Sequence, residues 1–418
     1  MLQGELLFDF LLLLYYIERE NNKRSEASWL KTVLSGGTLT DKMAALTLLV
    51  QDSPLHNLQC LDTLLTMASK KGRRECLMAV DTLRDMFLTG LLPDDRKLLH
   101  FNQHPLSELK DITKQNIDMR DKLLLMWHFE AMLKKKYAEF VKRLGEMSFD
   151  TLLATKEKSV SVITKLLTSK PEQETTLLPM LVNKLGDPTI KSKVMYLLSK
   201  LIEDHPNMTE VVVREVKQLL HRANVSPQAQ YYGICFLAQV RLSAKKAKLA
   251  TELINIYFFF FQAFLHKGEV DNKMMSALLT GVNRAYVYSK QGNNLDKSKD
   301  GIKTLDLSSQ MDAVYRLIPK VGFHTGVQAL QLLYQVTDAD TVSDRYYNSL
   351  YRKLADPNLK NSSKQAIFMN LIYKSLKRDV VDRRIKAFIK RILQVYAQQP
   401  PEVRLFLLLK HITETQNT

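Results

Sequence analysis

The chain has 418 residues, 45% of them hydrophobic, which is enough to build two or three ordinary domains or one long repeat array. Its 14 glycines and 12 prolines are few for this length and indicate a mostly helical protein, and the three cysteines, Cys60, Cys76 and Cys235, exclude a disulfide framework and predict buried thiols in a reducing compartment. The 60 Lys and Arg exceed the 44 Asp and Glu by a net charge of +16, which favours polyanionic partners, with nucleic acid first and anionic membrane second, over acidic small molecules.

The N-terminal segment, residues 1–25, is set apart by an apolar run from Leu6 to Ile17 that only Asp9 interrupts. The run is shorter than the roughly 20 residues that cross a bilayer. It also lacks the basic start and small-residue cleavage site of a secretory signal. We therefore expect a buried helix or an unusual chain start, and no membrane partner.

Residues 26–288 are predicted to form a helical-repeat array. Asp150, Asp187 and Ser226 each open a helical pattern, and they lie 37 and 39 residues apart. This period suits two-helix repeats, so the expected fold class is an all-α, HEAT/armadillo-like helical-repeat solenoid. In the clearest unit, Asp187 is expected to cap a helix whose first turn holds Pro188, and His205-Pro206 is expected to end it.

An aromatic cluster follows in the same array. Tyr257 precedes four consecutive phenylalanines, Phe258, Phe259, Phe260 and Phe261, which surround a helix rather than mark one face of it. Such a helix is either sandwiched between neighbouring repeats or leaves an aromatic face for a partner protein. The four phenylalanines are therefore candidate partner-binding residues.

The stretch from Lys273 to Tyr288 is the most particular in the chain. Its apolar spacing predicts a helix that ends at Gly281, because glycine accepts the left-handed geometry of a helix end. Asn283, Arg284 and Tyr286 would lie just beyond, either capping and packing or binding RNA or a partner. Residues 289–309, rich in Lys, Asp, Asn, Gly and Ser, are predicted to be a charged flexible loop, and residues 310–418 to be further helical repeats.

Two basic stretches in residues 310–418 are candidates for RNA binding. Arg345 and Arg352 alternate with Tyr346, Tyr347 and Tyr351, a mixture that could stack on unpaired bases, although the tyrosines also fit a buried helical stripe. The second stretch holds eight cations against two carboxylates, and a helix from about Arg383 would carry apolar residues on one face and cations on the other. The eight candidate phosphate ligands of this second stretch are Lys374, Lys377, Arg378, Arg383, Arg384, Lys386, Lys390 and Arg391. An acidic protein partner, or no partner, remains the alternative.

Sequence patterns of the common enzymes do not occur, since the chain has no phosphate-cradling glycine loop, no Gly-x-Ser-x-Gly elbow and no His-Glu-x-x-His helix. His56 and Cys60 lie one helical turn apart, but two ligands do not make a zinc site. We predict no catalytic residue, no metal and no cofactor.

Four short segments together resemble the CCAAT-binding-factor family of nucleolar proteins. They are Lys273–Tyr288, Val327–Leu330, Ser343–Tyr347 and Tyr373–Lys377. The motif residues are Gly281, Asn283, Arg284 and Tyr286, while Val287 stands where family members usually carry proline. Because the resemblance starts near Glu26 and relatives generally have a longer N-terminal region, we expect an abbreviated or alternatively begun form.

The resemblance implies a non-catalytic assembly factor of the large ribosomal subunit. Such a factor would act in the nucleus and nucleolus on pre-ribosomal particles, binding precursor ribosomal RNA and a second nucleolar-complex protein as a heterodimer, without a small-molecule substrate. The alternative is a transcription cofactor that acts at CCAAT-box promoters through other proteins, because no major-groove reading motif is present in the sequence.

Overall fold

The computed structural model describes residues 24–70, 73–106, 117–243, 246–267, 271–295, 307–336, 344–359 and 362–396. These residues form helices and connecting turns, and no β-strand occurs among them, which confirms the all-α prediction. The chain divides into two compact units, Met1–Val225 (unit 1) and Ser226–Thr418 (unit 2). Most of the apolar segment 1–25 lies outside the described residues.

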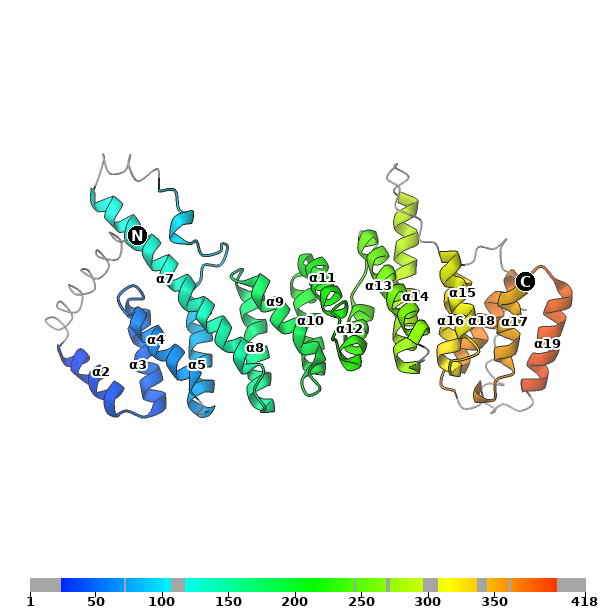
Figure 1. Ribbon diagram of the computed structural model, residues 1–418, viewed down its shortest axis with the longest axis horizontal. Coiled ribbons are helices and arrows are strands. Elements are labelled where there is room, and N and C mark those ends of the chain that lie inside the picture. The colour runs from blue at the N-terminus through cyan, green and yellow to red at the C-terminus, as the bar shows by residue number, and fades with distance from the viewer. Residues whose placement is uncertain are drawn as a thin grey trace, which may run out of the picture. The chain divides into compact units, whose positions relative to one another are not determined.

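Unit 1 is built from consecutive helices that pack on their neighbours along the chain, as Figure 1 shows for α3, α4 and α5. Its helices are α2 (Arg24–Gly36), α3 (Leu39–Asp52), α4 (Leu58–Ser69), α5 (Arg73–Met86), η1 (Phe87–Leu91), η2 (Phe101–Gln103), α7 (Ile117–Met147), α8 (Leu153–Ser169), α9 (Glu174–Asn183), η3 (Lys184–Gly186), α10 (Lys191–Asp204), η4 (Pro206–Met208) and α11 (Thr209–Leu220). The core contains the rings of Phe87, Tyr137 and Phe140, all fully buried. The ring centroids of Phe87 and Tyr137 lie 5.1 Å apart, edge to face, as aromatic pairs prefer.

The helices α8 and α10 run in the same direction, one predicted repeat apart. Lys156, near the start of α8, bonds to Asp187, just before α10, at 2.8 Å. Thr168, near the end of α8, accepts a bond at 2.9 Å from His205, just after α10, if the imidazole carries its proton on Nε2. This arrangement agrees with a stacked helical solenoid, whereas the HEAT or armadillo repeat type stays a prediction.

Helix caps confirm part of the sequence analysis. Ser226 caps α12 (Pro227–Gln239) by accepting the N–H of Ala229, and Pro227 fits the first turn as predicted. Asp187, in contrast, does not cap α10 directly. Its carboxylate accepts the N–H of Thr189 at 2.9 Å in a turn, and the helix begins only at Lys191.

Unit 2 starts with α12 and the two long helices α13 and α14, with α14 packed on both of the others, and continues with helices shorter than α13 and α14. Its helices are α12 (Pro227–Gln239), α13 (Ala247–Lys267), α14 (Asn272–Leu295), α15 (Leu307–Leu317), α16 (Phe323–Val336), α17 (Asp344–Leu354), η7 (Pro357–Leu359), α18 (Gln365–Arg378) and α19 (Asp382–Tyr396). In the described part of the chain, α13 has the length and hydropathy of a membrane span over Ala247–Leu265, but half of that stretch is buried inside the protein. We therefore treat α13 as a core helix.

The prediction that a helix ends at Gly281 is wrong, because α14 runs through Gly281 and Val287 to Leu295. Gly281 is buried in mid-helix, where a Cβ atom would lie only 2.6 Å from Cζ of Tyr257 on α13. The glycine thus serves close helix packing rather than a turn. The sequence alone could not separate these two uses of glycine.

The predicted loop 289–309 is correspondingly too long at both ends. Residues 289–295 continue α14 and residues 307–309 begin α15. Ser289 is buried, and its hydroxyl lies 3.3 Å from that of Thr251 on α13, so packing extends α14 past the motif. The middle of the predicted loop lies outside the described residues.

Candidate nucleic-acid interface

The predicted basic helix exists as α19, and the ring of Phe388 anchors its centre in unit 2. Phe388 is 1% exposed and packs edge to face against Tyr351, with ring centroids 5.3 Å apart. The predicted apolar stripe is less buried than expected, since Ile389 on the same helix is 49% exposed. The cations of α19 therefore lie on a helix that is buried along only part of one face within the described residues.

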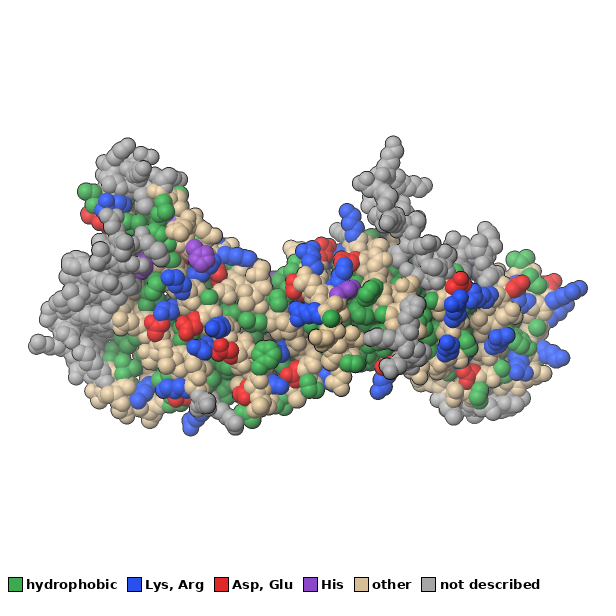
Figure 2. All heavy atoms as spheres, in the orientation of Figure 1, with side chains coloured by type: hydrophobic (Ala, Val, Ile, Leu, Met, Phe, Trp, Pro, Cys, Tyr) green, Lys and Arg blue, Asp and Glu red, His purple; other side chains and the backbone are tan. Residues whose placement is uncertain are grey.

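A group of cations on α17, α18 and α19, here named the basic surface, is exposed and without a partner in the described part of the chain. Figure 2 shows Lys and Arg side chains gathered over the region that Figure 1 assigns to these helices, with fewer Asp and Glu among them. The basic surface comprises Arg352, Lys374, Lys377, Arg383, Lys386 and Lys390. Unpaired surface cations of this kind are free to displace counterions from a polyanion.

Four other predicted phosphate ligands already have partners within unit 2. Arg378 donates to the carbonyl of Tyr334 at 3.4 Å, and Arg391 donates to the Gln394 side chain at 3.2 Å. Arg345 forms an ion pair with Asp312, and its guanidinium lies 4.4 Å above the ring centroid of Tyr315. The fourth residue, Arg384, has the most partners of the four.

Arg384 joins the start of α19 to the end of α18. Its guanidinium bonds to Asp379 at 2.6 and 2.8 Å, pairs with Asp344, and lies 4.1 Å above the ring of Tyr347. The Asp379 side chain is 1% exposed. Burial by itself would raise the pKa of Asp379, but the hydrogen bonds from Arg384 and from the N–H of Val381 outweigh it and lower that pKa. Arg384 thus holds the fold, whereas the basic surface does not.

The tyrosines between Arg345 and Arg352 belong mostly to the core. Tyr346 and Tyr347 are 0% and 3% exposed, and their hydroxyls bond to the Ser375 hydroxyl at 2.8 Å and to the Ser375 carbonyl at 3.1 Å. Tyr351 is 37% exposed, with its ring against Phe388. The packing interpretation of this segment therefore holds for Tyr346 and Tyr347, which cannot stack on bases.

The aromatic cluster of α13 is likewise mostly internal. Phe258, Phe260 and Phe261 are between 2% and 5% exposed, and only Phe259 is open to solvent, at 53%. Three of the four candidate partner-binding residues are thus placed in the core. A single exposed ring remains as a possible anchor.

The motif residues of α14 connect three helices. Asn283 donates to the carbonyl of Gln328 on α16 at 3.2 Å, and Arg284 donates to the carbonyl of Ala238 on α12. Tyr286 is 8% exposed. Internal packing therefore accounts for Asn283 and Tyr286, while Arg284 stays exposed and has no carboxylate partner among the described residues.

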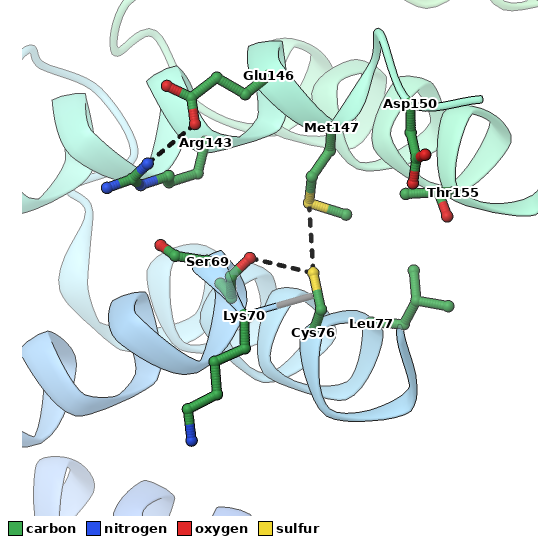
Figure 3. A pocket seen from close by; sticks show the side chains of 10 residues that line it. Ser69, Lys70, Cys76, Leu77, Arg143, Glu146, Met147, Asp150 and Thr155 are labelled. Atoms are coloured by element: carbon green, nitrogen blue, oxygen red, sulfur yellow. Dashed lines mark hydrogen bonds and ion pairs between the residues drawn. The ribbon is translucent and has the colours of Figure 1, made fainter. Parts of the chain in front are cut away.

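Unit 1 contains a cleft of about 350 Å³ between α4, α5 and α7, shown in Figure 3. The Cys76 thiol inside it donates to the carbonyl of Ala68 at 3.0 Å and lies 3.9 Å from the sulfur of Met147. Burial raises the pKa of Cys76, and the charges of Asp150 and Glu75 raise it further. The protonated thiol is a weak nucleophile, so this cleft gives no indication of covalent chemistry.

A second site in unit 1 fixes residues 92–106, which follow η1 and are non-helical apart from η2. The Glu130 carboxylate pairs with Arg96 and accepts the N–H of Leu99 at 2.9 Å, and Glu172 accepts the N–H of Leu98 at 2.7 Å. Burial would raise the pKa of Glu130, but the bonds from Arg96 and Leu99 lower it. The sequence analysis did not identify this carboxylate pair, because the residues it joins are more than thirty positions apart.

Comparison with known proteins places this helical architecture in a family. The CBF/Mak21 family model matches residues 326–416, which include α17, α18, α19 and the basic surface. Human CCAAT/enhancer-binding protein zeta is 48% identical over 392 residues, or 93% of this chain. The chain belongs to the CBF/Mak21 family.

Other relatives extend the comparison across fungi and animals. Drosophila melanogaster nucleolar complex protein 1 is 36% identical over 391 residues, and Chaetomium thermophilum ribosome biogenesis protein NOC1 is 33% identical over 443 residues. The chain spans 36% of the human relative, 33% of the Drosophila one and 41% of the Chaetomium one. None of these names indicates an enzyme family. The resemblance predicted from the four sequence segments is thus confirmed at the level of the family.

Proposed function

We propose that the chain is a non-catalytic factor of large-subunit ribosome assembly that acts in the nucleolus. In this proposal it binds precursor ribosomal RNA through the basic surface and also holds a second nucleolar-complex protein. The names of its Chaetomium and Drosophila relatives, a ribosome biogenesis protein and a nucleolar complex protein, support the cellular role.

The observation that carries the RNA proposal is the set of exposed, unpaired cations on α17, α18 and α19. Their charges are spread over three consecutive helices instead of one pocket, which suits contact with the backbone of a folded RNA. The stacking platforms typical of single-strand binding are reduced here, because Tyr346 and Tyr347 are buried. We therefore expect binding that depends on shape and charge rather than on sequence.

A matched set of lysine variants tests this proposal. In one variant Lys374, Lys377, Lys386 and Lys390 of the basic surface become glutamine. In the control variant four exposed lysines of unit 1 without partners among the described residues become glutamine: Lys135, Lys142, Lys165 and Lys200. Both variants lose the same net charge.

The readout is the salt dependence of binding to a structured fragment of large-subunit precursor rRNA. The plot of log K against log salt has a negative slope, and each lost phosphate contact lowers the magnitude of that slope by about 0.7–0.9. If all four lysines contact phosphates, the basic-surface variant should lower the magnitude of the slope by about 2.8–3.6, and the control by less than about 1. Equal slopes for the two variants would remove the basic surface from the proposal.

The transcription-cofactor alternative is favoured by one observation, the name of the human relative. Ultraviolet crosslinking of the tagged protein in cells, with sequencing of attached RNA and mass spectrometry of co-purified proteins, separates the two functions. Reads on large-subunit precursor rRNA together with assembly factors support ribosome assembly. Recovery of promoter-bound transcription factors without RNA contradicts it.

A further inference from the structure

A groove of about 640 Å³ lies in unit 2 between α12, α14 and the start of α16. One wall is the exposed face of the motif helix α14, where Lys273, Ser276, Ala277, Thr280 and Arg284 follow one another at helical spacing. Packing explains Gly281, which lies against α13, Asn283, which bonds to α16, and the buried Tyr286, but it does not explain this polar face. The groove is separate from the basic surface of α17, α18 and α19.

The walls of the groove are held in place by hydrogen bonds between the helices. Asn272 at the start of α14 accepts the N–H of Gly322 at 3.1 Å, which positions the first turn of α16. The Ser276 hydroxyl donates to Gln328 at 2.8 Å, and Gln328 in turn donates to Thr280 at 2.9 Å. These polar groups are already satisfied, so the groove is preformed and does not need to rearrange to accept a partner.

The charge of the groove is one-sided. The Lys273 side chain is exposed and has no hydrogen-bond or ion-pair partner among the described residues, and Arg284 donates to an uncharged carbonyl. Among the described residues no Asp or Glu lines the groove, although the charge of Asp271 acts on Tyr231 in its lining. Asp271, just before α14, accepts the N–H of Lys273 at 2.9 Å as a helix cap, and Lys364 adds positive charge near His324 on the α16 side.

Part of the groove lining is apolar, which favours a peptide over an RNA as its occupant. Ala238, Ala277 and Cys235 contribute small apolar surfaces, while Phe323 is buried. The other rings in the lining are the half-buried Tyr231, which packs edge to face on Tyr232, and the exposed His324. A nucleic acid would leave this apolar surface unused. A peptide could place an apolar side chain on it while its carboxylates meet Lys273 and Arg284.

We propose that this groove is a docking site for an acidic segment of a partner protein, with the carboxylates of that segment bound by Lys273 and Arg284 and one of its apolar side chains placed against Ala238 and Ala277. The inference is independent of RNA binding by the basic surface. If the groove does not bind an acidic segment, the proposal that the basic surface binds RNA is unaffected, and the reverse also holds.

The test uses the full chain and three fluorescent probes at physiological salt. The probes are a 12-residue peptide of Asp, Glu and Leu, the same peptide with Lys in place of the acids, and a 12-nucleotide polyuridylate. Fluorescence polarisation should show binding of the acidic peptide and not of the basic one. The variants Lys273→Glu and Arg284→Glu should each weaken acidic-peptide binding at least tenfold, while Arg316→Glu, an exposed cation of α15 outside the groove, should change it less than twofold.

A second measurement places the peptide in the groove. Cys235 lines the groove and is partly exposed, so the bound acidic peptide should slow its alkylation by N-ethylmaleimide at least fivefold, as measured by mass spectrometry. Cys60 in unit 1 is partly exposed as well, and its alkylation rate should not change.

Three results would overturn the inference. The first is that Lys273→Glu leaves binding of the acidic peptide intact, and the second is that the bound peptide does not protect Cys235. The third is that the acidic peptide does not bind at all, whereas polyuridylate binds and both Lys273→Glu and Arg284→Glu abolish its binding. Lys273 is exposed, and its side chain makes no hydrogen bond or ion pair within the described residues, so its variant should fold even if Arg284→Glu does not.

Discussion

Replacing Gly281 with alanine should destabilise unit 2, although the same change in an ordinary helix interior stabilises by about 1 kcal/mol. The added methyl group would meet three ring carbons of Tyr257 at 2.6 to 2.9 Å, closer than any real contact. Tyr257 is 1% exposed between α13 and α14, so its ring has little room to move. Overpacking of this kind costs about 1–3 kcal/mol. Because the ring is confined, the upper part of this range applies, about 2–3 kcal/mol, and subtracting the helix gain of about 1 kcal/mol leaves a net loss of about 1–2 kcal/mol.

Hydrogen exchange of the full chain, followed by mass spectrometry of peptides, measures this loss where it occurs. A loss of about 1–2 kcal/mol lowers protection of α13 and α14 roughly 5- to 30-fold. The control is Gly36→Ala at the end of α2, where a Cβ atom would meet nothing within 4 Å. That variant should change protection of α2 by less than about threefold.

A second variant isolates the contact itself. Tyr257→Leu removes the ring atoms that the new methyl group would touch, at the cost of a cavity. In that background Gly281→Ala should become neutral or stabilising by up to about 1 kcal/mol, because only the helix-propensity gain remains. If Gly281→Ala increases protection of α13 and α14 in the otherwise unchanged chain, Gly281 does not serve close helix packing.

Three further predictions concern single side chains. Burial would raise the pKa of Asp187, but its bonds to Lys156 and Thr189 lower that pKa from 3.8 to about 2. The stability that Asp187 contributes is therefore present above pH 4 and is lost as the pH falls toward 2. Asp187→Asn should flatten this acid dependence of stability in urea unfolding, and an unchanged pH profile would contradict the prediction. Phe261→Ala should lower the free energy of unfolding by about 3–5 kcal/mol in thermal unfolding, because its ring is buried. Phe259→Ser, at an exposed ring, should change it by less than about 0.5 kcal/mol. Equal effects would show that both rings lie in the same environment. Cys76 should react with iodoacetamide at pH 8 at least tenfold more slowly than the partly exposed Cys60, since its thiol is buried and its pKa is raised, and comparable rates would show that the cleft around it opens.

Periodicity and composition were sufficient to predict the helices and several of their ends. The apolar spacing after Ser226 and the His205-Pro206 stop correspond to α12 and to the end of α10. The start of α19 at Asp382 agrees with the helix predicted from about Arg383. These features depend on local interactions, such as a cap, a proline or a 3.6-residue repeat, so they can be recognised in the sequence itself.

Residues with two possible uses were decided by their neighbours in space. Gly281 could end a helix or admit an aromatic ring, and the approach of Tyr257 from α13 selects the second. Tyr346 could stack on a base or fill the core, and the Ser375 hydroxyl on α18 holds it in the core. In both cases the deciding partner is more than twenty positions away along the chain.

The cations of the last helices also show which properties the sequence determines and which depend on neighbours in space. Composition and clustering alone predict a basic face on the last helices, because charge is additive along the chain. Only the tertiary structure separates Arg384, neutralised by Asp379 and Asp344, from Lys386 and Lys390, which are exposed and unpaired in the described part of the chain. The sequence thus determined the helical fold class and the sign of the charged surface through local and additive properties. The tertiary structure determined which side chains are available to a partner, because availability depends on contacts between helices that the linear pattern does not contain.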